Sequence, residues 1–133
     1  MPIETGLTHE MKVAVTEDLT AEHYGNPGFP VLATPALCGL AERCCIAALA
    51  PHLESGQGSV GTSLSIEHLA ATPPGFTVTL RCTLQAVERS MLDFVVEATD
   101  GVDTIARITH RRAVVGMERF RQRVEAKAAR AAA

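Results

Sequence analysis

The chain has 133 residues, 47% of them hydrophobic, and a formal net charge of −3 at pH 7. This length and composition fit one domain with a single core. The charge balance excludes the basic surface expected of a nucleic-acid-binding protein and any polybasic membrane segment, and no apolar run reaches the roughly 18 residues of a membrane span. We therefore expect partners that are small molecules or other proteins.

The first 30 residues are predicted to hold one strand and one irregular segment. Residues 1–13 lack a basic region followed by an apolar run, so we expect no secretory signal and a cytoplasmic location. Apolar and polar residues alternate over residues 7–16, the pattern of a half-buried strand. Residues 20–30 are dense in Gly, Pro and Asn, which predicts a loop with a short helical turn near residues 21–24. Phe29 is an apolar side chain in this loop.

Residues 34–51 are predicted to form a helix of about four turns. Thr34 and Pro35 are residue types favoured at a helix N-cap and at the first helical position. Apolar residues then recur at spacings of three and four, so most of the helix should be buried. Glu42 interrupts this pattern midway. A carboxylate in a helix otherwise suited to the core is our first candidate for a functional group.

The four cysteines could form two disulfides or a metal site. Cys38, Cys44 and Cys45 lie on the predicted helix, and Cys82 lies on an apolar strand face. Adjacent Cys44 and Cys45 lack the two-residue gap typical of zinc sites. We expect four buried free thiols and no metal.

The second half of the chain is predicted to be mostly strand. Residues 59–69 alternate with Val60 and His68 on the apolar face and Gly61 on the other. Three further alternating segments predict successive antiparallel strands at residues 76–86, 92–98 and 102–115, with a hairpin at Asp100-Gly101.

The order of these elements is that of an α+β domain. Residues 1–133 should form one domain, with residues 117–133 as a short, fraying helical tail whose charges face solvent. An antiparallel five-stranded sheet must cover its apolar face with the one long central helix, and a sheet wrapped around a helix is the hotdog fold. Because such a sheet leaves an edge open, we expect a homodimer that pairs two edges.

Three polar residues are candidates for chemistry, namely Thr34, Glu42 and His68. Eight helical positions turn Glu42 about 80° from Thr34, so a dimer interface could bring one chain's Thr34 to the other's Glu42 and His68. We expect the carboxylate of Glu42 to face the imidazole of His68 across a small cleft shared by two subunits. A hydroxyl or a water can attack a thioester carbonyl if a carboxylate or imidazole accepts its proton, and amides at the helix N-terminus or beside Gly61 could stabilise the oxyanion. The residues alone leave other roles open: Thr34 as an N-cap, His68 as a core histidine and Glu42 as a partner of Arg43.

Motifs at the same positions resemble the fluoroacetyl-CoA thioesterase family. They are GSVGT at residues 58–62, HLAATPPG at residues 68–75 and THRRAV at residues 109–114, and the likeness runs from Phe29 to Val115. The resemblance implies a homodimeric hotdog hydrolase with its active site at the subunit interface. It also implies an acyl-CoA substrate and no bound cofactor, since CoA is part of the substrate.

The resemblance also implies roles for individual residues. The catalytic set would be Thr34, Glu42 and His68, with Gly61 as an active-site glycine and Arg112 as a substrate contact. The family has a Phe gate over the acyl pocket, and Phe29 would take that part, although this loop is one residue shorter. The resemblance therefore supports a short acyl-CoA substrate better than fluoroacetyl-CoA in particular.

Other interpretations remain open from the sequence. The fold also suits a non-catalytic acyl-CoA binding module, a hydratase or dehydratase, or a structural dimerisation domain. His110 shares a strand face with Arg112 and could line the same pocket or make a structural hydrogen bond. Arg112 could bind the phosphates of CoA or pair with Glu42 or Asp103.

Overall fold

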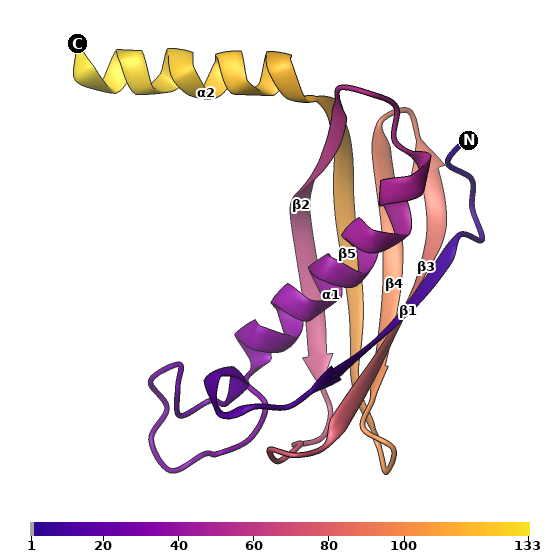
Figure 1. Ribbon diagram of the computed structural model, residues 1–133, viewed down its shortest axis with the longest axis vertical. Helices are drawn as coiled ribbons and strands as arrows, with labels where there is room; N and C mark the ends of the chain where they lie inside the picture. Colours follow the sequence, from indigo (N-terminus) through magenta and orange to yellow (C-terminus); the bar gives the residue numbers. More distant parts are fainter. Residues whose placement is uncertain (1) are drawn as a thin grey trace.

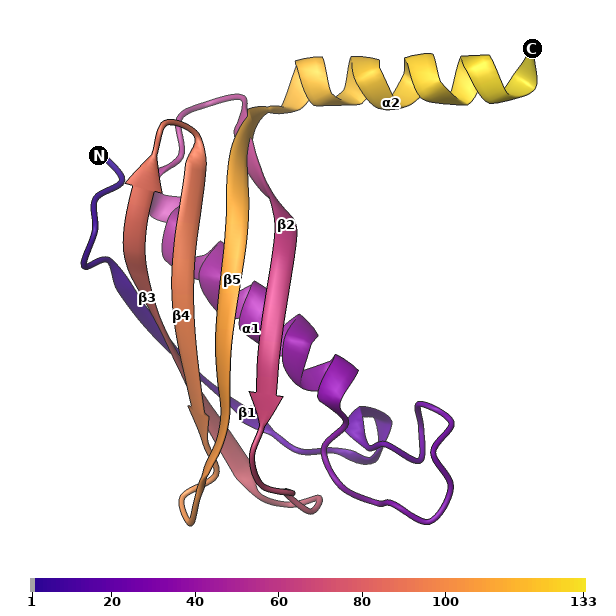
Figure 2. The same ribbon diagram turned by 180° about the vertical axis from the view of Figure 1, so that it is seen from behind.

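Five antiparallel strands form one sheet with the strand order β1-β3-β4-β5-β2 in the computed structural model, which describes residues 2–133. A long helix, α1 (Thr34–Leu49), crosses one face of this sheet in both ribbon views (Figures 1 and 2). The α+β arrangement predicted from the sequence is confirmed. The strands are β1 (Thr8–Ala14), β2 (Gln57–His68), β3 (Thr77–Glu88), β4 (Met91–Thr99) and β5 (Thr104–Gly116).

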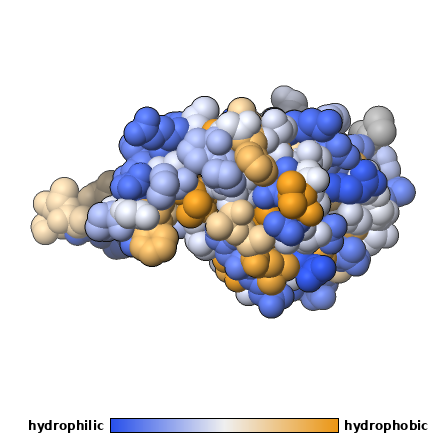
Figure 3. Space-filling view, turned by 90° about the horizontal axis from the view of Figure 1, so that it is seen from below, coloured by the Kyte–Doolittle hydropathy of each residue, from blue (hydrophilic) through white to orange (hydrophobic). Residues whose placement is uncertain are grey.

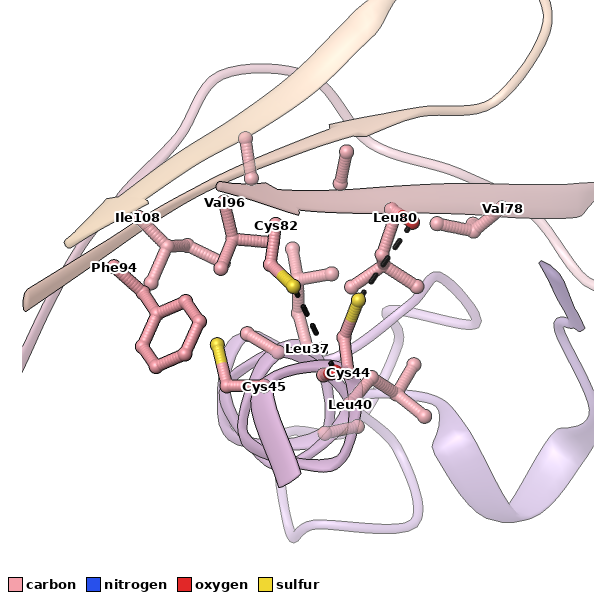
Figure 4. Packing of buried hydrophobic residues seen from close by; sticks show 14 of the residues in the cluster. Leu37, Leu40, Cys44, Cys45, Val78, Leu80, Cys82, Phe94, Val96 and Ile108 are labelled. Carbon is pink, nitrogen blue, oxygen red and sulfur yellow. Dashed lines mark hydrogen bonds between the residues drawn. The ribbon is translucent and has the colours of Figure 1, made fainter. Parts of the chain in front are cut away.

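The core fills the space between α1 and strands β3, β4 and β5 (Figure 4). The period of three and four on α1 and the period of two on β3 and β4 each place apolar residues on the side that faces the other element. The thiol of Cys44 donates to the carbonyl oxygens of His9 and Leu80, and the thiol of Cys82 donates to the carbonyl of Cys44. All four cysteines are free; three are buried, whereas Cys38 is half-buried.

The ends of α1 differ from the prediction. Its N-cap is Ala33, whose backbone is extended, and Thr34 is the first helical residue and makes no capping hydrogen bond. The interpretation of Thr34 as an N-cap is therefore wrong, and its hydroxyl is free for another partner. The α-helix ends at Leu49 and continues as a 3₁₀ turn, Ala50–His52. The reason is that Pro51 has no N–H to extend the helical hydrogen bonds.

Strand β2 contains an irregularity that reverses the predicted faces. The pairing with β5 shifts register between Gly61 and Ser63, so one extra residue is inserted. Gly61 pairs with Arg112 and faces α1, whereas Val60 pairs with Ala113 and faces away. The prediction that Val60 shares the face of His68 was wrong, because a bulge changes the alternation of side chains along the strand.

Two other segments differ from expectation. A 3₁₀ turn covers Glu17–Leu19, ahead of the predicted helical turn, and residues 21–25 form hydrogen-bonded turns. The tail is helical as predicted but not short, because α2 (Met117–Ala132) has 16 residues and projects from the end of β5 past β2 (Figures 1 and 2). Neither helix within residues 2–133 has the length and apolar character needed to cross a membrane.

The end of the molecule opposite α2 carries separate hydrophobic patches among polar side chains (Figure 3). The loops at this end connect β1 to α1, β2 to β3 and β4 to β5. These loops expose several large apolar side chains, and the N-terminus of α1 lies beside them. The exposed side chains are Tyr24, Phe29, Leu69, Phe76 and Val102.

Candidate active site

Thr34 and His68 form a hydrogen-bonded pair within one chain. The first residue of α1 meets the last residue of β2, with 2.8 Å between Thr34 Oγ1 and His68 Nδ1. A shallow cavity of about 330 Å³ lies at the pair and is lined by Thr34, His68 and residues 69–71. The N-terminus of α1 and the end of β2 therefore place a hydroxyl and an imidazole side by side at one cavity.

The surroundings of His68 favour the neutral imidazole. Burial lowers the pKa of His68, an effect that the backbone of Ala70 partly opposes. Nε2 of His68 is buried, and no group in the described part of the chain lies in hydrogen-bond geometry with it. When Nδ1 accepts, the Thr34 hydroxyl donates to it, which is the arrangement that general-base activation of a hydroxyl needs.

Glu42 contacts a different histidine from the one expected. Its Oε2 lies 3.3 Å from Arg112 Nη1 and 3.5 Å from Nε2 of His110. His110 and Arg112 both lie on β5, on the face of the sheet that packs against α1. Glu42 is partly buried, with 43% of its side chain exposed in a single chain. The carboxylate thus has a buried cationic partner on one side and an open side.

Arg112 is held by four polar contacts. Its Nε donates to Ser59 Oγ at 3.0 Å and its Nη2 donates to the Ser59 carbonyl oxygen at 2.9 Å. Its Nη1 lies 3.3 Å from Glu42 Oε2 and 3.0 Å from His110 Nε2. Only 4% of the Arg112 side chain is exposed. The guanidinium is therefore a fixed neighbour of the carboxylate in this chain rather than a free cation at the surface.

Gly61 allows this cluster to form. A Cβ atom at Gly61 would lie 2.4 Å from Glu42 Oε2 and 3.0 Å from Cε1 of His110. A distance below 3.0 Å requires one of the groups to move. The absence of a side chain at Gly61 thus lets the carboxylate rest against β2.

The predicted site residues divide into two groups. Thr34 and His68 form one pair, and Glu42 belongs with Gly61 and Arg112. Eight residues of α1 separate Thr34 from Glu42, which is about 12 Å along the helix. We expected Thr34 of one chain to meet Glu42 and His68 of the other, but Thr34 instead pairs with His68 of its own chain. Glu42 does not contact His68 within one chain, and a meeting of the two groups across subunits stays a prediction.

Three further observations complete the description of the site. Phe29 is 56% exposed in its loop, and its predicted role as a gate stays a prediction. Sequence reasoning missed Ser59, whose hydroxyl and carbonyl oxygen hold Arg112; its place in the GSVGT motif was the available signal. No group of three or more His, Cys, Asp or Glu side chains within residues 2–133 is arranged to hold a metal ion.

Comparison with known proteins decides the family. A family model described as "Fluoroacetyl-CoA-specific thioesterase" matches residues 15–118. A fluoroacetyl-CoA thioesterase from Streptantibioticus cattleyicolor is 49% identical over 100 residues, covering 74% of this chain and 72% of the relative. The chain belongs to the fluoroacetyl-CoA-specific thioesterase family. The predicted family and enzyme class, a thioester hydrolase, are thereby confirmed.

Solved structures of the family agree with the fold. A crystal structure of a variant of the fluoroacetyl-CoA-specific thioesterase is 40% identical, with a TM-score of 0.87, and covers 96% of this chain and 98% of that chain. Another variant, in complex with fluoroacetate and CoA, is 41% identical over 89% of this chain and 99% of that chain, with a TM-score of 0.83. A Thermus thermophilus thioesterase superfamily member, 24% identical, shares the fold with a TM-score of 0.90, covering 97% of this chain and 96% of that chain. The hotdog fold is confirmed.

Proposed function

We propose that this protein hydrolyses a short-chain acyl-CoA to the free acid and CoA. The observation that carries the proposal is the 2.8 Å hydrogen bond between Thr34 Oγ1 and His68 Nδ1 beside a small cavity, in a chain of a thioesterase family. Membership of the fluoroacetyl-CoA-specific thioesterase family supports a small acyl group. The 49% identity to a fluoroacetyl-CoA thioesterase makes fluoroacetyl-CoA one of the substrates to be tested.

The proposed chemistry uses Thr34, Glu42 and His68. Glu42 and His68 handle the protons. His68 accepts a proton through Nδ1 when the hydroxyl of Thr34 attacks the thioester carbonyl, and Glu42 accepts it when the attacking group is a water that Thr34 positions. The carbon–sulfur bond then breaks, and the CoA sulfur takes the proton from the group that accepted it, His68 or Glu42. Where Thr34 itself attacks, a water releases the acid from the acyl-Thr34 ester in a second step. Amides beside Gly61 and at the N-terminus of α1 stabilise the oxyanion.

A homodimer would complete this site. Strand β2 is an edge of the sheet, twelve residues long, and Gly61 and Ser63 are exposed on it. Unpaired edge groups favour pairing with a second chain. Antiparallel pairing of two β2 strands, centred midway between Gly61 and His68, sets each Gly61 opposite the partner's His68. The open side of each Glu42 then faces the Thr34–His68 pair of the other subunit.

Roles in substrate binding form part of the same proposal. Phe29 lies in the exposed loop before α1 and closes over the acyl group from that side. Arg112 acts on the substrate through Glu42, because its donors are engaged with Ser59, His110 and the carboxylate. These contacts favour a role for Arg112 in holding Glu42 over direct binding of CoA phosphates.

We further infer one domain over residues 1–133, supported by its single core, and a cytoplasmic location, supported by four free thiols.

Release of free thiol from a panel of CoA esters tests the proposal. The panel contains acetyl, fluoroacetyl, propionyl, butyryl and aryl esters, so activity and acyl size are measured together. Glu42→Ala should lower kcat by at least about tenfold, whereas the exposed Glu54→Ala, as a matched control, should not. Turnover by Glu42→Ala within threefold of the parent would contradict the mechanism. Saturable binding of the esters with no thiol released would favour a non-catalytic binding module.

A further inference from the structure

His110 is a buried histidine outside the proposed catalytic set. Only 1% of its side chain is exposed, and it points from β5 toward α1 beside Gly61. Both ring nitrogens have partners within hydrogen-bond distance. Nδ1 lies 2.9 Å from the carbonyl oxygen of Ser63, and Nε2 lies 3.0 Å from Arg112 Nη1. A buried ring with two polar partners has one orientation, because any rotation breaks both bonds.

These two partners determine where the ring hydrogen lies. A backbone carbonyl oxygen can only accept a hydrogen bond, so Nδ1 must carry the hydrogen. A guanidinium can only donate, so Nε2 must accept. His110 is therefore a neutral imidazole with its hydrogen on Nδ1. Its 3.5 Å approach to Glu42 Oε2 is not an ion pair, because Nε2 has no hydrogen to offer.

The same Arg112 nitrogen contacts both His110 and Glu42. Nη1 has two hydrogens, and its two neighbours are His110 Nε2 at 3.0 Å and Glu42 Oε2 at 3.3 Å. The other side of the guanidinium is occupied by the hydroxyl and carbonyl oxygen of Ser59. Because the fork is planar and rigid, contacts at Nε, Nη1 and Nη2 together leave the group no freedom to turn. The position of the Glu42 carboxylate thus depends on the His110 ring, which is buried.

We propose that His110 is a positioning residue, whose fixed neutral tautomer holds Arg112 and, through it, the carboxylate of Glu42. This inference rests on the proposed function, in which Glu42 takes part in catalysis. Glu42 needs such support because it is a long, half-exposed side chain with several rotamers. Small misplacements of a catalytic group can lower the rate by up to about a hundredfold.

Two substitutions at His110 separate the two ring nitrogens. The amide of His110→Asn lies near the position of Nδ1, so it can still donate to the Ser63 carbonyl but does not reach Arg112. The amide of His110→Gln extends to the position of Nε2, so its oxygen can accept from Arg112. We expect His110→Asn to lose about tenfold or more in kcat at unchanged KM, and His110→Gln to stay within about threefold of the parent.

A stability control distinguishes positioning from folding. Val78→Ala removes buried methyl groups from β3, which is separated from β5 by β4, so it should lower the melting temperature without changing kcat. An equal loss of kcat in the Asn and Gln variants would overturn the proposal. So would a loss in His110→Asn no larger than that of Val78→Ala at matched stability.

Nitrogen-15 NMR of the parent protein tests the tautomer without any turnover. With labelled histidine and the His110→Gln spectrum for assignment, Nδ1 should be protonated and Nε2 unprotonated at neutral pH. A signal for hydrogen on Nε2 would overturn the proposal even if the Asn variant fails to fold. If the parent released no thiol from any CoA ester, the proposed function would fail while the tautomer measurement stayed valid.

Discussion

A methyl group added at Gly61 would meet the carboxylate of Glu42. The added carbon would lie 2.4 Å from Oε2, and ordinary contacts begin near 3.4 Å, so the carboxylate must move by about 1 Å. Glu42 is the flexible end of a half-exposed side chain, so it can yield where the backbone of β2 does not. Gly61→Ala should therefore displace the carboxylate from Arg112 while the strand stays in place.

The expected loss is in rate rather than in stability. A displacement of about 1 Å at a catalytic group costs up to about a hundredfold, so we expect kcat to fall by one to two orders of magnitude. The free energy of unfolding should change by less than about 1 kcal/mol, since Ala is favoured over Gly in a strand by roughly this amount and offsets the 3.0 Å contact with His110. Thiol release and thermal unfolding measure the two quantities.

Gly58 offers a matched control on the same strand. A Cβ at Gly58 would lie 3.3 Å from the side chain of Met117, a flexible neighbour remote from Glu42. Gly58→Ala should keep its activity. The reasoning would be refuted if Gly61→Ala turned over at the parental rate. An equal loss in both variants would refute it too, because the effect would then come from the strand and not from the carboxylate.

Three other predictions follow from the site. Thr34→Val should lower kcat by about a hundredfold or more, because the partner of His68 is lost, while Thr34→Ser keeps the hydroxyl and most of the activity; thiol release compares them. Because burial lowers the pKa of His68, the unfolded chain binds a proton on this side chain more readily than the folded chain. The free energy of unfolding and the activity should both be full at neutral pH and fall as the pH drops through and below the ordinary histidine range. In urea titrations, His68→Gln should remove this contribution to the pH dependence of the free energy of unfolding. Light scattering should give twice the 14.1 kDa chain mass; full activity at the single-chain mass would contradict a site shared by two subunits.

Local pattern was a good guide where elements are regular. Strands β3 and β4 bury every second residue, and α1 buries its apolar residues at spacings of three and four, so both periods could be recognised in the sequence. The pattern failed at β2, because one inserted residue reverses the alternation and has no distinct composition. It also failed at Thr34, where residue preference predicted a cap and the hydroxyl instead binds His68.

In the candidate site, too, the sequence predicted some features and not others. The residue types, their places on α1, β2 and β5, and the family motifs all follow from the linear order of amino acids. Their partners do not: Arg112 meets Ser59 and Glu42, which are 53 and 70 residues away in the chain. Such contacts depend on which strands are neighbours and on the bulge that sets their register. The spacing of apolar residues along the chain predicts neither the neighbouring strands nor the bulge.

The sequence by itself therefore determined the α+β fold and the set of polar residues available for chemistry, because these depend on composition and on short-range periodicity, and its motifs indicated the family. Only the tertiary structure decided that Thr34 pairs with His68 and that Glu42 rests against Gly61 between His110 and Arg112. The physical reason is that these pairings come from the packing of α1 across a bulged edge strand, where a shift of one residue changes which side chains face each other.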